Sequence, residues 1–152
     1  MDYRIETKEA FKLIMKKKKV SRSQELTAAE IGEFWKKCGS DGTIKSLCKY
    51  IPEENIFKDC IVGASFGKDA TDEEFPYAIG AMYNGLPVEE EDLIVEEIPA
   101  HTYVVFPCVG KMPESFQKLY QQIYSEFFPS ALRRNRLRSI PVGRCLFTGL
   151  SL

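Results

Sequence analysis

The sequence contains a single histidine, His101, and this scarcity restricts the catalytic chemistry that the chain can support. A Ser-His-Asp or Cys-His unit would have to use this one side chain, which follows Pro-Ala at an expected turn. The sequence has no Walker loop, dinucleotide-binding fingerprint, His-Glu-x-x-His motif or EF-hand loop. We therefore predict no catalytic residue and no cofactor, and an enzyme is the weaker of the functional alternatives.

The absence of closely spaced cysteine pairs and of long apolar runs is also informative. The five cysteines are odd in number and form no close pairs, which disfavours both a disulfide framework and a zinc site; they are Cys38, Cys48, Cys60, Cys108 and Cys145. We expect them to be small apolar fillers and predict no metal site. No apolar run approaches the ~20 residues of a membrane span, and the N-terminus has no apolar signal core. The expected location is the cytoplasm, without membrane contact.

The net charge of −1 hides a strong asymmetry along the chain. Residues 1–50 hold 12 basic and 7 acidic residues, residues 51–130 hold 4 and 15, and residues 131–152 hold 5 and 0. An acidic middle favours cationic ligands over nucleic acid. The lysine run Lys16–Lys19 is interpreted as a solvated or lysine-protected edge strand rather than a nucleic-acid contact, because no aromatic residues interleave with it.

A length of 152 residues predicts one domain. Apolar periodicity and turn residues predict alternating groups of strands and helices. Thr27–Glu30 reads as a capping box, with Gly39 after the helix it starts, and Asn84-Gly85 reads as a hairpin turn. The expected strands are 3–6, 10–20, 60–67, 75–83 and 102–106, and the expected helices begin at Thr27, Thr43 and Pro113, the last ending at Pro129.

Residues 98–117 read Ile-Pro-Ala-His-Thr-Tyr-Val-Val-Phe-Pro-Cys-Val-Gly-Lys-Met-Pro-Glu-Ser-Phe-Gln. This run closely resembles a hallmark of the gyrase-inhibitor-like small-molecule-binding domain, which is also the effector-binding domain of many AraC-type bacterial transcription regulators. The opening strand from Ala10 and the Phe-x-Tyr-x-Ile-Gly pattern that begins at Phe75 are similar to the same family.

The resemblance implies an α+β fold in which two β-α-β-β modules form one antiparallel sheet. The helices would lie on one side, with a ligand cleft between the modules. Five aromatic residues are candidates for lining that cleft: Trp35, Tyr77, Tyr83, Phe106 and Tyr120. We expect about half of them to line it, and the alternative is that most of them are core. Aromatic faces attract cations by about 0.5–2 kcal/mol per contact. Glu96 and Glu97 could add charge selectivity.

The leading hypothesis is a stand-alone module that senses or sequesters aromatic, cationic small molecules, as multidrug-binding effector domains do. Because no helix-turn-helix precedes it, we expect no direct DNA binding. Two alternatives remain from the family: a hydrolase of electrophilic cyclopropane-type genotoxins, and a protein that inhibits or protects DNA gyrase. The partners implied are a small ligand and, for the alternatives, gyrase or a transcription regulator.

The tail departs from the family after Ser130. The family continues with a strand that resembles Glu-Val-Tyr and supplies an acidic ligand residue, whereas residues 131–152 contain five arginines and no acid. A strand over 139–146 is still expected, with Arg144 in place of the acid. We hypothesise that residues from about 131 onward are a frameshifted version of the family's C-terminus, loosely packed and leaving the sheet edge poorly covered.

Overall fold

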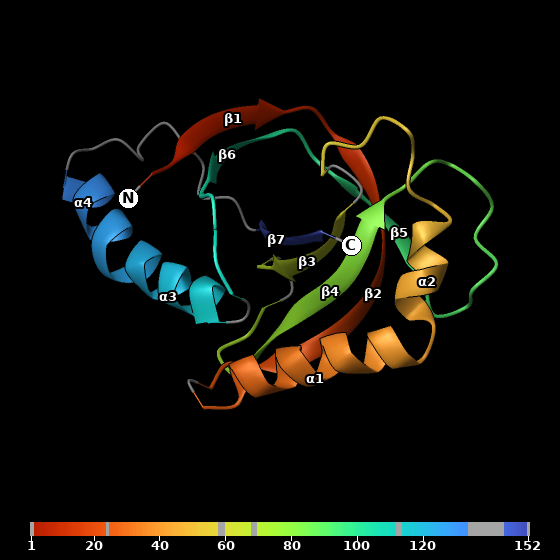
Figure 1. The fold of residues 1–152 in the computed structure, drawn as a ribbon, viewed down its shortest axis with the longest axis horizontal. Coiled ribbons are helices and arrows are strands. Elements are labelled where there is room, and N and C mark those ends of the chain that lie inside the picture. Colours follow the sequence, from red (N-terminus) through yellow and green to blue (C-terminus); the bar gives the residue numbers. More distant parts are fainter. Residues whose placement is uncertain are drawn as a thin grey trace. The chain divides into compact units, whose positions relative to one another are not determined.

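The computed structural model describes residues 2–23, 25–57, 60–67, 70–111, 114–133 and 145–151. Backbone contacts divide the chain into two units. Unit 1 comprises Met1–Glu9 and Ala100–Gly143, and unit 2 comprises Ala10–Pro99 and Arg144–Leu152. The elements, shown in Figure 1, are β1 (Arg4–Lys8), β2 (Phe11–Ser21), α1 (Thr27–Ser40), α2 (Thr43–Cys48), β3 (Cys60–Phe66), β4 (Glu74–Met82), β5 (Ile94–Ile98), β6 (His101–Val105), α3 (Glu114–Gln122), the π-helix η1 (Ile123–Phe127), α4 (Phe128–Arg133) and β7 (Cys145–Ser151).

Unit 2 is built on an antiparallel five-stranded sheet in the order β5-β2-β4-β3-β7. Successive residues of β2 enter different apolar clusters, as the two-residue period of a strand requires. Ile14 packs in the cluster that contains Phe34 of α1 and Leu47 of α2, so both helices cover one face. Leu13 and Met15 enter a second cluster on the other face. The sequence predicted a mostly one-sided apolar strand here, but both faces of its first half are buried because β2 is a central strand.

Gly80 permits the close approach of the two central strands. It pairs with Met15 in the β2–β4 ladder. A Cβ atom at Gly80 would lie 2.5 Å from the carbonyl oxygen of Ile14 and 2.9 Å from the Cβ of Met15. The strands can therefore keep this spacing only with glycine at this position.

Unit 1 contains the two-stranded ladder of β1 and β6 and the helical segment α3-η1-α4. In unit 1 the β1–β6 ladder includes the pair Lys8↔His101, and in unit 2 the β2–β5 ladder includes the pair Phe11↔Ile98. Pro99 falls between β5 and β6 in the sequence, and it has no N–H to donate to a ladder. The α+β class and the antiparallel pairing are confirmed, but the described strands form two sheets instead of the single sheet that the resemblance implied.

Three local predictions are wrong for identifiable reasons. Asn84-Gly85 does not close a hairpin, because β4 and β5 both pair with β2 and the chain between them must cross over. The carboxylate of Glu30 accepts from the backbone N–H and the hydroxyl of Ser21 instead of completing a capping box. Gly39 lies inside α1, which continues to Ser40, and the glycine that has a positive φ after this helix is Gly42.

The helix that begins at Glu114 does not end at Pro129 as predicted. It passes through the π-helix η1 and continues as α4 to Arg133. Pro129 is the second residue of α4 and follows the wider π turn. A proline is tolerated there, because the hydrogen-bonding register changes at a π turn and the first turn of a helix does not need every N–H.

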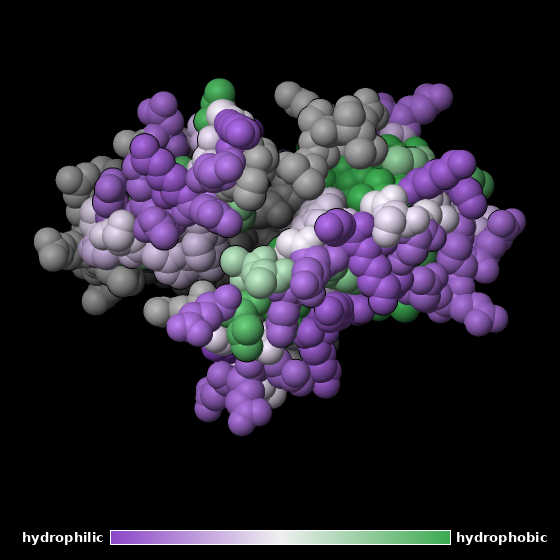
Figure 2. All heavy atoms as spheres, turned by 60° about the horizontal axis from the view of Figure 1, so that its bottom comes forward, coloured by the Kyte–Doolittle hydropathy of each residue, from purple (hydrophilic) through white to green (hydrophobic). Residues whose placement is uncertain are grey.

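The lysine run Lys16–Lys19 pairs with the acidic middle of the chain. Lys16 contacts Asp92, Lys17 contacts Glu96 and Lys19 contacts Glu74 at Nζ–carboxylate distances of 3.2, 2.5 and 3.5 Å. The ammonium of Lys18 lies 5.9 Å from the ring centre of Phe34. Part of the charge asymmetry in the sequence is therefore ion pairing within unit 2. Figure 2 shows a largely hydrophilic surface on the side where Figure 1 places α1.

The tail supplies the edge strand β7, which pairs antiparallel with β3 from Cys60↔Ser151 to Phe66↔Cys145. This pairing differs from the expected poorly covered edge, because the run of Cys145–Ser151 is apolar enough to form a strand. The first part of the strand predicted over 139–146 lies outside the described residues. Among the helices that the structure describes, none has the length and apolarity needed to traverse a bilayer.

Candidate functional site

The predicted site residues Trp35 and Tyr77 contact each other in unit 2. The indole Nε1–H of Trp35 donates to the Tyr77 hydroxyl at 2.7 Å. Tyr77 is only 5% exposed, and its ring also packs edge-on against Phe34 at a centroid distance of 6.3 Å. Tyr77 thus holds Trp35 by a hydrogen bond from within the core, while Trp35 is half-buried and packs against the same cluster.

Tyr83, the third candidate, belongs to the connection between β4 and β5. Its hydroxyl donates to the carbonyl of Leu86, and its ring lies 6.1 Å from that of Tyr50. The Tyr50 hydroxyl donates to Glu90 at 2.6 Å, and Lys49 donates to the same carboxylate at 3.1 Å. These two contacts, with Tyr50 as the larger cause, lower the pKa of Glu90 to about 2. Tyr83 therefore lies where a long loop is attached to α2.

Phe106, the fourth candidate, follows β6 in unit 1 and belongs to a three-ring cluster. Its ring centre lies 6.1 Å from that of Tyr3 and 4.9 Å from that of Phe127, and Tyr3 and Phe127 are 5.0 Å apart. The cluster joins the residues flanking β1 and β6 to the π-helix. Phe106 therefore helps to hold the helical segment on the strand pair.

Tyr120, the fifth candidate, lies in an aromatic row that runs along α3, η1 and α4. The row consists of Phe116, Tyr120, Tyr124 and Phe128, with successive ring centres 6.2, 4.7 and 5.3 Å apart. Tyr120 is 41% exposed and Tyr124 is 54% exposed. Burial, followed by the neighbouring hydroxyl of Tyr124, raises the pKa of Tyr120 well above its ordinary value, so the phenol stays neutral at physiological pH.

The five candidate residues are divided between the two units. Trp35, Tyr77 and Tyr83 belong to unit 2, and Phe106 and Tyr120 belong to unit 1. Tyr124 was not among the sequence candidates, although its four-residue spacing from Tyr120 was a usable signal. The carboxylate of Glu96 does not supply a free negative charge, because Lys17 pairs with it. Within the described ranges, no three metal-binding side chains are grouped.

Comparisons with known proteins identify the fold. SAV2435, in a structure bound to tetraphenylphosphonium, is 20% identical with a TM-score of 0.68, over 82% of this chain and 71% of that one. A putative bacterial transcription regulation protein from Staphylococcus aureus MU50 is 16% identical with a TM-score of 0.72, over 97% and 84%. An integron cassette protein from the mobile metagenome of Vibrio cholerae is 16% identical with a TM-score of 0.57, over 82% and 77%. No curated protein matches the chain.

A family model described as an integron-associated effector binding protein matches residues 4–139. The match covers both the opening strand and the residue 98–117 run on which the resemblance rested, and the expectation of an effector-binding domain is confirmed. The chain belongs to the family of integron-associated effector binding proteins.

Proposed function

We propose that the protein binds aromatic, cationic small molecules, and that the aromatic row of α3, η1 and α4 provides part of the binding surface. The observation that carries the proposal is the pair of exposed rings, Tyr120 and Tyr124, whose centres lie 4.7 Å apart. Adjacent aromatic faces attract flat hydrophobic molecules and, through the ring quadrupole, cations. The row also includes the π-helix, a feature that is frequent at functional sites.

Two further facts support this ligand class. The family is one of effector-binding proteins, and SAV2435, which shares the fold, has been solved with tetraphenylphosphonium, an aromatic cation. The acidic composition of residues 51–130 contributes less than its count suggests, since several of its carboxylates are paired with lysines.

The test is calorimetric titration with tetraphenylphosphonium and with tetraphenylborate, two ions of nearly the same shape and opposite charge. We expect micromolar binding of the phosphonium, about −8 kcal/mol, and at least roughly tenfold weaker binding of the borate. Tyr120→Ala should weaken phosphonium binding by about 0.5–2 kcal/mol, the value of one cation–π contact. Leu86→Ala, which truncates an exposed apolar side chain of unit 2, is the matched control and should not change the affinity.

Fluorescence of Trp35, the only tryptophan, reports whether the unit 2 aromatics take part. If the phosphonium quenches Trp35 fluorescence with the same midpoint concentration as in the calorimetric titration, Trp35 belongs to the site. If no saturable binding occurs below about millimolar phosphonium, or if tetraphenylborate binds as tightly, the proposal is wrong.

A further inference from the structure

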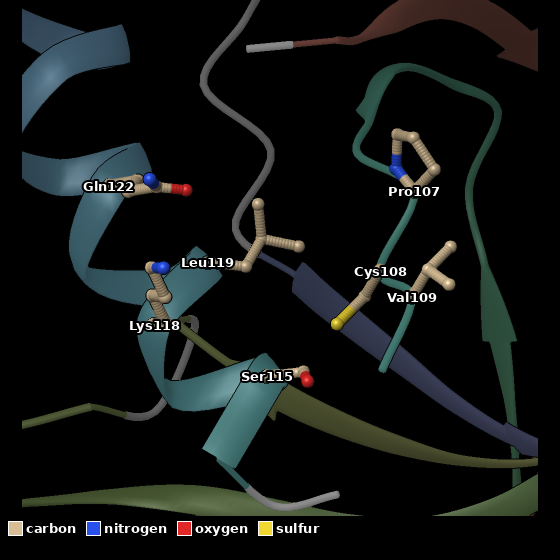
Figure 3. Close-up of a pocket in the computed structure, with 7 residues that line it drawn as sticks. All are labelled: Pro107, Cys108, Val109, Ser115, Lys118, Leu119 and Gln122. Atoms are coloured by element: carbon tan, nitrogen blue, oxygen red, sulfur yellow. The ribbon is translucent and has the colours of Figure 1, made fainter. Parts of the chain in front are cut away.

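A pocket of about 340 Å³ lies within unit 1, between residues 107–109 and α3. Its lining residues are Pro107, Cys108, Val109, Ser115, Lys118, Leu119 and Gln122. Figure 3 shows Ser115, Leu119 and Gln122 projecting from α3 toward this segment, with the sulfur of Cys108 directed toward the helix. The volume is at the lower end of the range for small-molecule sites.

The helical spacing separates this pocket from the aromatic row. Ser115, Leu119 and Gln122 recur at four and then three residues, so they share one stripe of α3. Phe116 and Tyr120 follow the same spacing one residue later and therefore lie on a neighbouring stripe. The pocket is consequently a separate surface from the one proposed for aromatic cations.

The wall of the pocket is held by a glycine that no other residue can replace without strain. Gly110 has a φ of 131°, and a Cβ atom there would lie 2.2 Å from the hydroxyl oxygen of Ser115. The backbone N–H of Ser115 donates to the carbonyl of Lys111 at 2.9 Å, which ties the loop to the first turn of α3. The loop that follows residues 107–109 and the first turn of α3 are therefore held together by backbone conformation and a backbone hydrogen bond.

The polar side chains of the pocket are donors that have no partner among the described residues. In the part of the chain that the structure describes, Lys118 forms no ion pair, and neither Ser115 nor Gln122 uses its side chain in a hydrogen bond. None of the described lining residues carries a carboxylate. Glu114, one turn before Lys118 on α3, is the nearest acid along the helix and does not pair with it. The pocket is thus lined by an ammonium, an amide and a hydroxyl together with the apolar Pro107, Val109 and Leu119. This combination suits a molecule with a carboxylate on an apolar body.

We propose that this pocket is a binding site for small organic carboxylates, with Lys118 as the residue that holds the carboxylate. Gln122 and Ser115 supply neutral donors to its oxygens, and Leu119 and Pro107 contact the apolar part of the molecule. Val109, which is 92% exposed, lies at the rim. The proposal does not depend on the aromatic-cation function, since it uses a different stripe of α3 and the opposite ligand charge.

Cys108 makes the pocket measurable in the intact protein. Its thiol is free and exposed, and so is that of Cys48 in unit 2, which serves as an internal reference. Each thiolate displaces iodide from the methylene carbon of iodoacetamide or iodoacetate, forming a C–S bond, and mass spectrometry of the separate peptides gives each rate. Benzoate is the probe ligand, and benzamide is its neutral control.

We expect benzoate to slow iodoacetamide alkylation of Cys108 but not of Cys48, and benzamide to slow neither. Lys118→Gln should abolish this protection. It should also lower the iodoacetate-to-iodoacetamide rate ratio at Cys108, because the ammonium attracts the anionic reagent, with no change at Cys48. Glu114→Gln, which removes the nearby acid, should raise that ratio at Cys108.

Three results would overturn the proposal: protection by benzamide equal to that by benzoate, protection that survives Lys118→Gln, or a rate ratio that Lys118→Gln leaves unchanged. Lys118 is exposed, so its replacement should not affect folding. Phosphonium binding measured on Lys118→Gln separates the two proposals, because it should persist or strengthen when the ammonium is removed.

Discussion

Gly80→Ala is the substitution whose effect on stability the structure predicts most directly. The added Cβ would meet the Ile14 carbonyl oxygen at 2.5 Å, the Met15 Cβ at 2.9 Å and the Met15 Cα at 3.2 Å. These atoms cannot move aside easily, because Met15 is paired with β4 on one side and with β5 on the other. The strain must therefore be absorbed by the centre of the sheet.

The expected loss follows from two opposing effects. Overpacking against rigid neighbours costs about 3 kcal/mol, the upper part of the usual range, because the neighbours are backbone. Replacing glycine by alanine also restricts the unfolded chain, which returns about 0.7 kcal/mol. The free energy of unfolding should fall by about 2 kcal/mol, which for a chain of this size lowers Tm by about 4–8 °C.

Gly32→Ala is the matched control, since it makes the same chemical change at a position where the added Cβ meets no neighbouring atom. Gly32 lies inside α1 with nothing within 4 Å of its added Cβ. Alanine there should raise the free energy of unfolding by about 0.5–1 kcal/mol through helix propensity. Urea and thermal unfolding followed by circular dichroism measure both variants. A Tm of Gly80→Ala within about 2 °C of the unsubstituted protein would refute the packing argument.

Two further predictions concern the polar contacts of unit 2. The lowered pKa of Glu90, 4.5 in a free side chain and about 2 here, means that its contribution to stability is complete above about pH 4.5 and is lost as the pH falls toward 2. Glu90→Gln should therefore be less stable than the unsubstituted protein in urea at neutral pH, and the gap should narrow near pH 3; a gap independent of pH would contradict this. Tyr77→Phe should cost about 0.5–1.5 kcal/mol, because it leaves the indole N–H of Trp35 without its acceptor, and unchanged unfolding and Trp35 emission would show that the bond contributes nothing.

The strands and helices that the sequence predicted correctly are those with a strong local signal. Residues 74–82 and 101–105 form β4 and β6 within a residue or two of the expected bounds, because β-branched and aromatic residues alternate there. The order of the strands in the sheet was not predictable in the same way. It depends on which faces are covered, and the only local hint was Ile14, an apolar residue between Leu13 and Met15.

The candidate site shows the same division between local and tertiary information. The spacing of Phe116 and Tyr120 predicts a shared helix stripe, and continuing that spacing to Tyr124 would have completed the exposed pair. The bond between Trp35 and Tyr77 joins α1 to β4, and no local pattern encodes it. The pairing of the lysine run with the acidic middle likewise depends on contacts far apart in sequence, so residue counts overstated the charge available to a ligand.

The composition of the tail supports a prediction about the gene. Residues 131–152 contain five arginines and no acid, and the family match ends at residue 139, before β7. One of the many back-translations that the residues Gly143–Phe147 permit is GGA AGA TGT TTA TTC. Shifted by one base, it reads Glu-Asp-Val-Tyr, which resembles the family strand that carries the acidic ligand residue. We therefore expect the gene to encode an acid-bearing strand in another frame beyond about codon 131.

Sequencing the gene tests this expectation, and an early stop in the shifted frame would show that the arginine-rich tail is native. If the strand is encoded, the chain with the restored frame should bind tetraphenylphosphonium more tightly by about 1–3 kcal/mol, the usual value of a hydrogen bond to a charged group. Replacing the regained glutamate by glutamine should remove most of that gain, because the glutamine keeps the shape and loses the charge. A restored chain with unchanged affinity would mean that the aromatic residues bind the cation without help from an acid.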